Sequence, residues 1–162
     1  MVLPYFSGER TPLNDPLARG IVAGLTLSHT RSHIYRAILE GIAYGIRQNI
    51  EAMAEAGEKP KTLIAIGGGT KNRLWLQIVS DVTGLPQLIR KTPGAAYGDA
   101  YLAGVGMEIF PDLASIQNWL EPPEQVLPDN NIKNLYDRYY SLYKDLYKSS
   151  KDVAHQLAGL GG

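Results

Sequence analysis

The sequence predicts an α/β fold with a parallel βαβ core, and three adjacent features of the chain indicate it. Residues 62–66 form a continuous apolar run, which is typical of a buried parallel strand. Apolar residues then recur at helical spacing before Gly84, which is placed to end a helix; they are Leu74, Trp75, Ile78, Val79 and Val82. Residues 85–90 are a second strand candidate. A strand, a helix and a strand in this order predict one right-handed crossover.

Composition limits the classes of function. The 162 residues have the length of a single domain. With 16 basic and 16 acidic residues, the formal net charge of zero argues against nucleic-acid or anionic-membrane binding. The absence of cysteine excludes disulfides, thiolate metal sites and cysteine nucleophiles. Because no apolar run reaches the ~18 residues that span a bilayer, and no secretory signal is visible, we expect no membrane partner and a cytoplasmic location.

The part before the βαβ unit predicts a long helix. Residues 1–28 combine turn residues with short apolar pieces, so we expect a loop and extended segment there. The helix is expected to begin at Ser28 or Thr30 and to end before Gly57. It carries an apolar stripe of Ile34, Ile38, Ile42, Ile46 and Ile50. A second row, Ala37, Gly41 and Gly45, indicates close approach to another element or to a ligand, and tight helix packing is favoured.

The part after the βαβ unit predicts two further helical regions. Residues 97–105 are rich in small residues and predict a short helix; a second is expected near residues 112–119, before a proline-rich linker. A final helix is expected over residues 131–157. Its predicted apolar face consists of Leu135, Tyr139, Leu142, Leu146 and Val153. Five tyrosines lie between Tyr136 and Tyr147, where packing is favoured over base stacking.

The strongest candidate site is the run Gly67, Gly68, Gly69, Thr70, Lys71 and Asn72 between the first strand and its helix. Glycines let a backbone pass close to a ligand, and a helix N-terminus offers unpaired N–H groups to a phosphate. Asn72 is expected in the first helical turn, where its amide could bond a base or a ribose. On the local pattern alone, a nucleotide loop and a tight turn without ligand are equally supported.

Known nucleotide motifs fit this run poorly. A phosphate-binding Walker loop needs Ser or Thr after the lysine, but Asn72 follows Lys71. The dinucleotide fingerprint needs a third glycine where Asn72 stands. Arg90 and Lys91 at the end of the second strand keep an NADP-binding, Rossmann-like module open as an alternative.

Other candidate chemistry is sparse. His29 and His33 have i+4 spacing but lack the glutamate of a zinc-binding run, so we assign no metal ligand. No set of a nucleophile, a base and an orienting group can be placed either, and we assign no catalytic residue.

Three segments in order resemble the C-terminal part of the FGGY carbohydrate kinases. The first is residues 3–12, continued by residues 15–29, and the second is residues 36–44. The third joins the glycine run to residues 97–104. The resemblance implies an actin-like ATPase fold related to RNase H. It makes residues 1–162 a partial, ATP-binding C-terminal domain whose first strands are missing, with a loop and extended segment over 1–28, a nucleotide-binding core over 29–108 and a terminal helix over 131–158.

The resemblance also implies a site. Gly68 and Asn72 would contact the adenosine part of ATP, Gly67 and Gly69 would shape the loop, and residues 98–103 would lie near this pocket. ATP and Mg²⁺ would be the cofactors, with the metal held mainly by parts outside this chain. The sugar would bind through the missing N-terminal domain.

The expected function is therefore the ATP-binding portion of a kinase that phosphorylates a sugar or polyol hydroxyl, similar to a xylulokinase and inactive as this chain alone. The alternative is a non-catalytic, self-associating domain. Missing strands would leave an exposed sheet edge, so we expect a homo-oligomer.

Overall fold

The protein combines helices with two small sheets. The computed structural model describes residues 1–90 and 95–160. Its α-helices are α1 (Arg31–Glu55), α2 (Arg73–Thr83), α3 (Ala95–Gly106) and α4 (Lys133–Leu160). Its strands are β1 (Val2–Leu3), β2 (Ile21–Val22), β3 (Leu63–Ala65), β4 (Gln87–Ile89) and β5 (Glu124–Val126). Three short 3₁₀ helices complete it: η1 (Gly68–Lys71), η2 (Ala114–Trp119) and η3 (Asn130–Ile132).

The larger sheet has the order β3-β4-β5. β3 and β4 are parallel and α2 connects them, so the predicted βαβ unit is confirmed. β5 pairs antiparallel with β4 inside the segment where a proline-rich linker was expected. The linker prediction was wrong there because Glu124 and Gln125 carry no strand signal of their own, and pairing with β4 decides their conformation.

The first strand is less buried than its apolar sequence predicts. The side chain of Ile64 is 63% exposed and that of Ile66 is 68% exposed. Leu63 packs instead against the buried core, beside α2. A continuous apolar run is typical of a strand covered on both faces, whereas β3 is covered on one face and has β4 on only one edge within the described chain.

α1 begins and ends where the sequence predicts. Thr30 is its N-cap residue, and the Nδ1 atom of His33 accepts the Thr30 backbone N–H at 3.1 Å. At the other end, Gly57 has φ +99° and donates to Ala54 O, while Glu58 donates to Met53 O. These two bonds form a Schellman cap.

In the glycine row on α1, Gly41 packs closely on the backbone of a strand rather than on a helix, whereas Gly45 has only an ordinary contact with the Tyr143 hydroxyl. A Cβ atom on Gly41 would lie 2.4 Å from the backbone oxygen of Val2, so α1 approaches β1 without a side chain between them. The isoleucine stripe is not the most buried face: Ile42 is 36% exposed, whereas Leu39, Ala43 and Tyr44 are buried.

The face of α4 that packs on the core is formed mainly by tyrosines. Of the predicted face, Leu146 packs against the core, and the assignment of its other members was wrong. Leu135, Leu142 and Val153 are at least half exposed, whereas Tyr136, Tyr140 and Tyr143 are buried. The buried hydroxyls have partners; for example, Tyr143 accepts from Tyr5 at 2.7 Å. Burial raises the pKa of Tyr5 to about 12, so this donor stays protonated. Tyrosine has a large apolar ring with a polar end, so it can be buried where its hydroxyl is satisfied.

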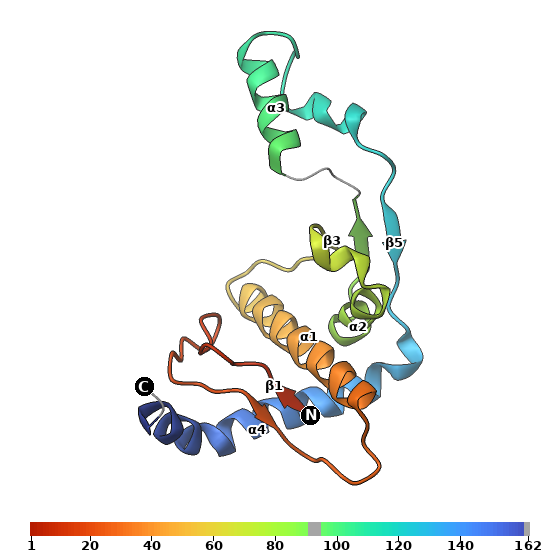
Figure 1. Cartoon of the computed structure of the whole chain (residues 1–162). Coiled ribbons are helices and arrows are strands. Elements are labelled where there is room, and N and C mark those ends of the chain that lie inside the picture. Colours follow the sequence, from red (N-terminus) through yellow and green to blue (C-terminus); the bar gives the residue numbers. More distant parts are fainter. Residues whose placement is uncertain (91–94, 161–162) are drawn as a thin grey trace.

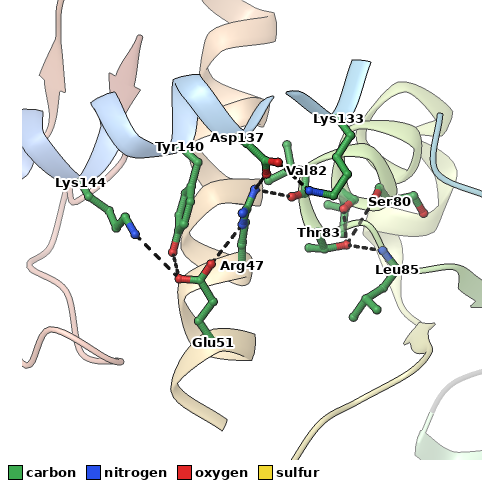
Figure 2. A network of polar contacts seen from close by, with 11 residues as sticks. Arg47, Glu51, Ser80, Val82, Thr83, Leu85, Lys133, Asp137, Tyr140 and Lys144 are labelled. Atoms are coloured by element: carbon green, nitrogen blue, oxygen red, sulfur yellow. Dashed lines mark hydrogen bonds and ion pairs between the residues drawn. The ribbon is translucent and has the colours of Figure 1, made fainter. Parts of the chain in front are cut away.

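Arg47 of α1 connects the three helices of the main body (Figure 2). Its Nη1 atom donates to Asp137 of α4 at 2.7 Å and to the backbone oxygen of Val82 in α2 at 3.2 Å. Its guanidinium carbon lies 4.2 Å from the centre of the Tyr140 ring. One side chain of α1 thus contacts both α2 and α4.

α3 lies apart from this body (Figure 1). The predicted helix over residues 97–105 is confirmed, and the one expected near 112–119 is the 3₁₀ helix η2. α3 has its own aromatic cluster, in which Tyr101 stacks on Phe110 with 4.6 Å between ring centres and Trp119 meets both edge-on. No helix in the described part of the chain is long and apolar enough to cross a membrane.

Candidate functional site

The glycine run forms a tight loop between β3 and α2. Gly67 has φ +82°, a conformation that residues with a Cβ atom rarely adopt. The hydroxyl of Thr70 then donates back to the Gly67 oxygen at 2.7 Å, and the Thr70 backbone N–H donates to the same oxygen. The loop continues as η1 and reaches α2 at Asn72.

The three glycines meet different demands. Gly67 is required by its positive φ angle. Gly69 is required by packing, because a Cβ atom there would lie 2.2 Å from the Trp75 ring. Gly68 has neither demand: its φ is not positive, and a Cβ atom would meet nothing within 4 Å. The fold therefore gives no reason for glycine at position 68, and the space beside it is open to a ligand.

Asn72 is the N-cap residue of α2. It therefore lies one position before the first helical turn, in which the sequence analysis expected it. Its Oδ1 atom accepts the Trp75 backbone N–H at 3.1 Å. Its Nδ2 atom donates to the hydroxyl of Tyr35 at 2.8 Å. The amide thus has a structural role at the helix start, and one Nδ2 hydrogen remains for a ligand.

The loop is rich in hydrogen-bond donors. Within the described chain, no oxygen accepts the backbone N–H of Gly68 or Gly69. The exposed ammonium group of Lys71 lies on the same loop, and Arg73 forms an ion pair with Glu124 of β5. That bond to Glu124 raises the pKa of Arg73 further, so its charge is permanent. Free N–H groups next to a helix N-terminus favour an anionic or acceptor-rich ligand.

A cavity of about 310 Å³ lies behind the loop, at the lower end of the range for small-molecule sites. Gly69, Thr70 and Trp75 line it from the loop side. The Nε1 atom of Trp75 is buried and has no hydrogen-bond partner in the described part of the chain. The other lining residues come from α1, α2, β3 and β4 or directly follow β3: Ile46, Leu63, Ile64, Ala65, Ile66, Leu76, Val79 and Gln87. Residues 98–103 of α3 are not among them, and Figure 1 shows α3 lying apart from β3.

The two histidines have a structural role at the start of α1. Nδ1 of His29 accepts the Thr26 backbone N–H at 2.9 Å, as Nδ1 of His33 does from Thr30. Each ring therefore carries its proton on Nε2 when neutral, which leaves no lone pair for a metal. Across residues 1–90 and 95–160, no three acidic or histidine side chains gather as a metal site.

The structure bears on two further residues of the predicted site. Lys91, which supported the NADP alternative, lies outside the described residues, so Arg90 is the described residue of that basic pair. Tyr35 was missed, because it lies 37 residues before its partner Asn72 and no local pattern connects them. Only the packing of α1 beside α2 brings the pair together.

Comparison with known proteins gives one consistent result. The model of the FGGY family of carbohydrate kinases, C-terminal domain, matches residues 1–107. Xylulose kinases of Staphylococcus epidermidis and Bacillus subtilis are each 35% identical to the chain, over 156 and 152 residues. These alignments cover 95% and 93% of this chain but 32% and 30% of the relatives. The chain thus spans about a third of the length of these relatives.

Solved structures agree with this result. The crystal structure of xylulose kinase from Rhodospirillum rubrum matches with a TM-score of 0.82 at 33% identity. The match covers 96% of this chain and 31% of the chain in that structure. The crystal structure of Plasmodium falciparum glycerol kinase with ADP matches with a TM-score of 0.72 at 26% identity. This match covers 95% of this chain and 30% of the chain in that structure.

Proposed function

The chain belongs to the FGGY family of carbohydrate kinases, and from this premise we propose that it is the ATP-binding portion of an ATP-dependent kinase that phosphorylates a sugar or polyol hydroxyl. The observation that carries the proposal is Gly68. Its lack of a side chain serves neither backbone conformation nor packing, and it lies in a donor-rich loop within the region that the family model matches.

The residues present fit the nucleoside end of such a ligand. Gly68 leaves room for close approach, while the N–H groups of Gly68 and Gly69 and the amide of Asn72 are donors for its oxygen and nitrogen acceptors. In this proposal Gly68 and Asn72 contact adenosine, and Gly67 and Gly69 hold the loop in shape. The actin-like architecture, with a nucleotide-binding core over residues 29–108 and a terminal helix over 131–158, is part of the same proposal.

The chain's own contribution to phosphoryl transfer is then binding and orientation. When bound, Mg²⁺ neutralises charge on the phosphates of ATP. The described residues contain no cluster of ligands for it, so the proposal assigns the metal, the base on the sugar hydroxyl and the sugar contacts to parts of the kinase beyond this chain. We accordingly expect no sugar phosphorylation by this chain alone.

Calorimetric titration of the chain with MgADP and MgATP tests the proposal. Asn72→Ser is the informative variant, because serine retains the helix cap but removes the amide. We expect weak binding by the wild type, weaker binding by Asn72→Ser, and no change in Asn134→Ser, which alters an exposed asparagine of α4. Equal affinity of wild type and Asn72→Ser would remove Asn72 from the site. Preference for NADP over ATP would support the Rossmann-like alternative instead.

Self-association is the second candidate, and β3 is the observation that favours it. Its outer edge has no strand partner within the described residues, and two large apolar side chains beside it, Ile64 and Ile66, are mostly exposed. Unpaired edges with apolar side chains are sites of association between chains.

A further inference from the structure

The aromatic residue beside the glycine loop differs from the other hydrogen-bonded tyrosines of this protein. The hydroxyls of Tyr136, Tyr140 and Tyr143 have partners inside the body of the protein, and their rings are buried. Tyr35 is 52% exposed, so its ring gains little from packing. Its hydroxyl nevertheless lies 2.8 Å from the Nδ2 atom of Asn72.

The hydrogen-bond pattern fixes the orientation of the Asn72 amide. Because Oδ1 accepts the Trp75 backbone N–H, Nδ2 is the atom that faces Tyr35, and the tyrosine oxygen must accept. The reversed amide would place two donors against each other at Trp75. The Trp75 N–H sets the orientation of the amide, and Tyr35 holds the amide in that orientation by a second contact, from another helix.

Two hydrogens remain without an acceptor in the described part of the chain: the second Nδ2 hydrogen of Asn72 and the hydroxyl hydrogen of Tyr35. They belong to atoms 2.8 Å apart, one on α1 and one at the start of α2. Both helices pack into the buried core, through Leu39 and Ala43 on α1 and through Ile78 and Val82 on α2. The spacing of the two donors is thus set by helix packing.

We propose that Tyr35 is a positioning residue of the nucleotide site, which holds the Asn72 amide in place so that its remaining Nδ2 hydrogen faces an acceptor on the nucleoside. This inference rests on the proposed ATP-binding function and extends it to a residue outside the glycine loop. A purely structural role explains the arrangement less well, because a neutral hydrogen bond between exposed groups adds little net stability.

A double-mutant cycle on ADP affinity tests the inference, with Tyr35→Phe, Asn72→Ser and their combination, in the full 162-residue chain with Mg²⁺. We expect Tyr35→Phe to weaken ADP binding about fivefold, as the loss of one oriented hydrogen bond predicts. We expect the double variant to bind no more weakly than Asn72→Ser, because Tyr35 acts through that amide. Melting temperatures of Tyr35→Phe and wild type should agree within about 2 °C.

Tyr139→Phe is the matched control, because Tyr139 is 45% exposed and lies on the exposed side of α4. It should leave ADP affinity unchanged. Equal affinity of wild type and Tyr35→Phe, losses that multiply in the double variant, or a loss matched by the control would each overturn the role of Tyr35 and leave ATP binding intact. Failure of the wild-type chain to bind ADP would overturn the proposed function together with this inference.

Discussion

Replacing Arg47 with alanine should loosen the packing of α1, α2 and α4 at once. Its guanidinium group bonds Glu51 on its own helix, Asp137 on α4 and the Val82 oxygen at the end of α2 (Figure 2). The same group covers the face of the Tyr140 ring. No other residue in the described part of the chain makes all these contacts. The variant removes them while the bonds from Tyr136 to Glu40 and from Tyr140 to Glu51 remain, and Arg47 is not part of the buried apolar core.

The size of the expected stability loss depends on how exposed the partners of Arg47 are to water. The side chains of Asp137 and Glu51 are 33% and 43% exposed, so each ion pair contributes about 0.5–1 kcal/mol after screening by water. The bond to the Val82 oxygen adds about 1 kcal/mol, and the contact with Tyr140 about 0.5–1 kcal/mol. The buried part of the arginine stem contributes packing as well. We expect Arg47→Ala to lower the free energy of unfolding by about 3 kcal/mol and the melting temperature by about 6–12 °C.

Urea unfolding followed by circular dichroism measures this loss. Arg138→Ala is the matched control, since Arg138 is an exposed arginine of α4 with no polar partner among the described residues, and it should change stability by less than about 0.5 kcal/mol. Arg47→Lys should fall between the two, because an ammonium group cannot bond Asp137 and Val82 with the fixed fork of a guanidinium. A loss below about 1 kcal/mol for Arg47→Ala, or an equal loss in Arg138→Ala, would refute the assignment.

Three further predictions concern other parts of the molecule. Burial alone would raise the pKa of Asp15, but hydrogen bonds from Tyr147 and His155 outweigh it and lower the pKa from 3.8 to about 2. Because the folded pKa is the lower one, this cluster stabilises the chain above about pH 4 and its contribution disappears as the pH falls toward 2; melting curves over pH 2–6 should show a smaller pH dependence for Asp15→Asn. Gly69→Ala should lower the melting temperature because of the Trp75 ring, whereas Gly68→Ala should leave it unchanged and weaken ADP binding; the opposite order in a thermal melt and a titration would contradict the division of roles. If the edge of β3 mediates self-association, Ile64→Lys should shift the sedimentation coefficient toward that of a monomer, and an oligomer that persists in this variant must use another surface.

The helix ends could be predicted from sequence because caps are local. Gly57 and Gly84 end α1 and α2 through positive φ angles that glycine adopts without strain, and Thr30 caps the start of α1. β5 could not be predicted, because Glu124 and Gln125 form a strand only through pairing with β4. The buried face of α4 was assigned mainly to aliphatic side chains for a related reason. Hydrophobic ranking ignores the partners, such as Tyr5 and Glu51, that allow tyrosine hydroxyls to be buried.

The candidate site also has a part that the sequence predicts and a part that only the packing of the helices reveals. The glycine loop and Asn72 are contiguous, so the sequence alone predicts them as one loop between a strand and a helix. Tyr35 comes from a helix 37 residues earlier, and only the packing of α1 beside α2 brings it to the loop. Residues 98–103 were expected near the pocket by resemblance, but they are not among the residues that line it.

The separation of roles within the loop decides how the proposed function can be tested. A site in which every residue also supports the fold cannot be examined by mutation, because each variant would lose binding and stability together. In this loop the positive φ angle falls on Gly67 and the close contact on Gly69, while the helix cap uses only the Oδ1 atom of Asn72. Gly68, the remaining Nδ2 hydrogen of Asn72 and the hydroxyl hydrogen of Tyr35 have no comparable role in stabilising the fold. A loss of nucleotide affinity after changes at these groups, with an unchanged melting temperature, would therefore report on the ligand itself.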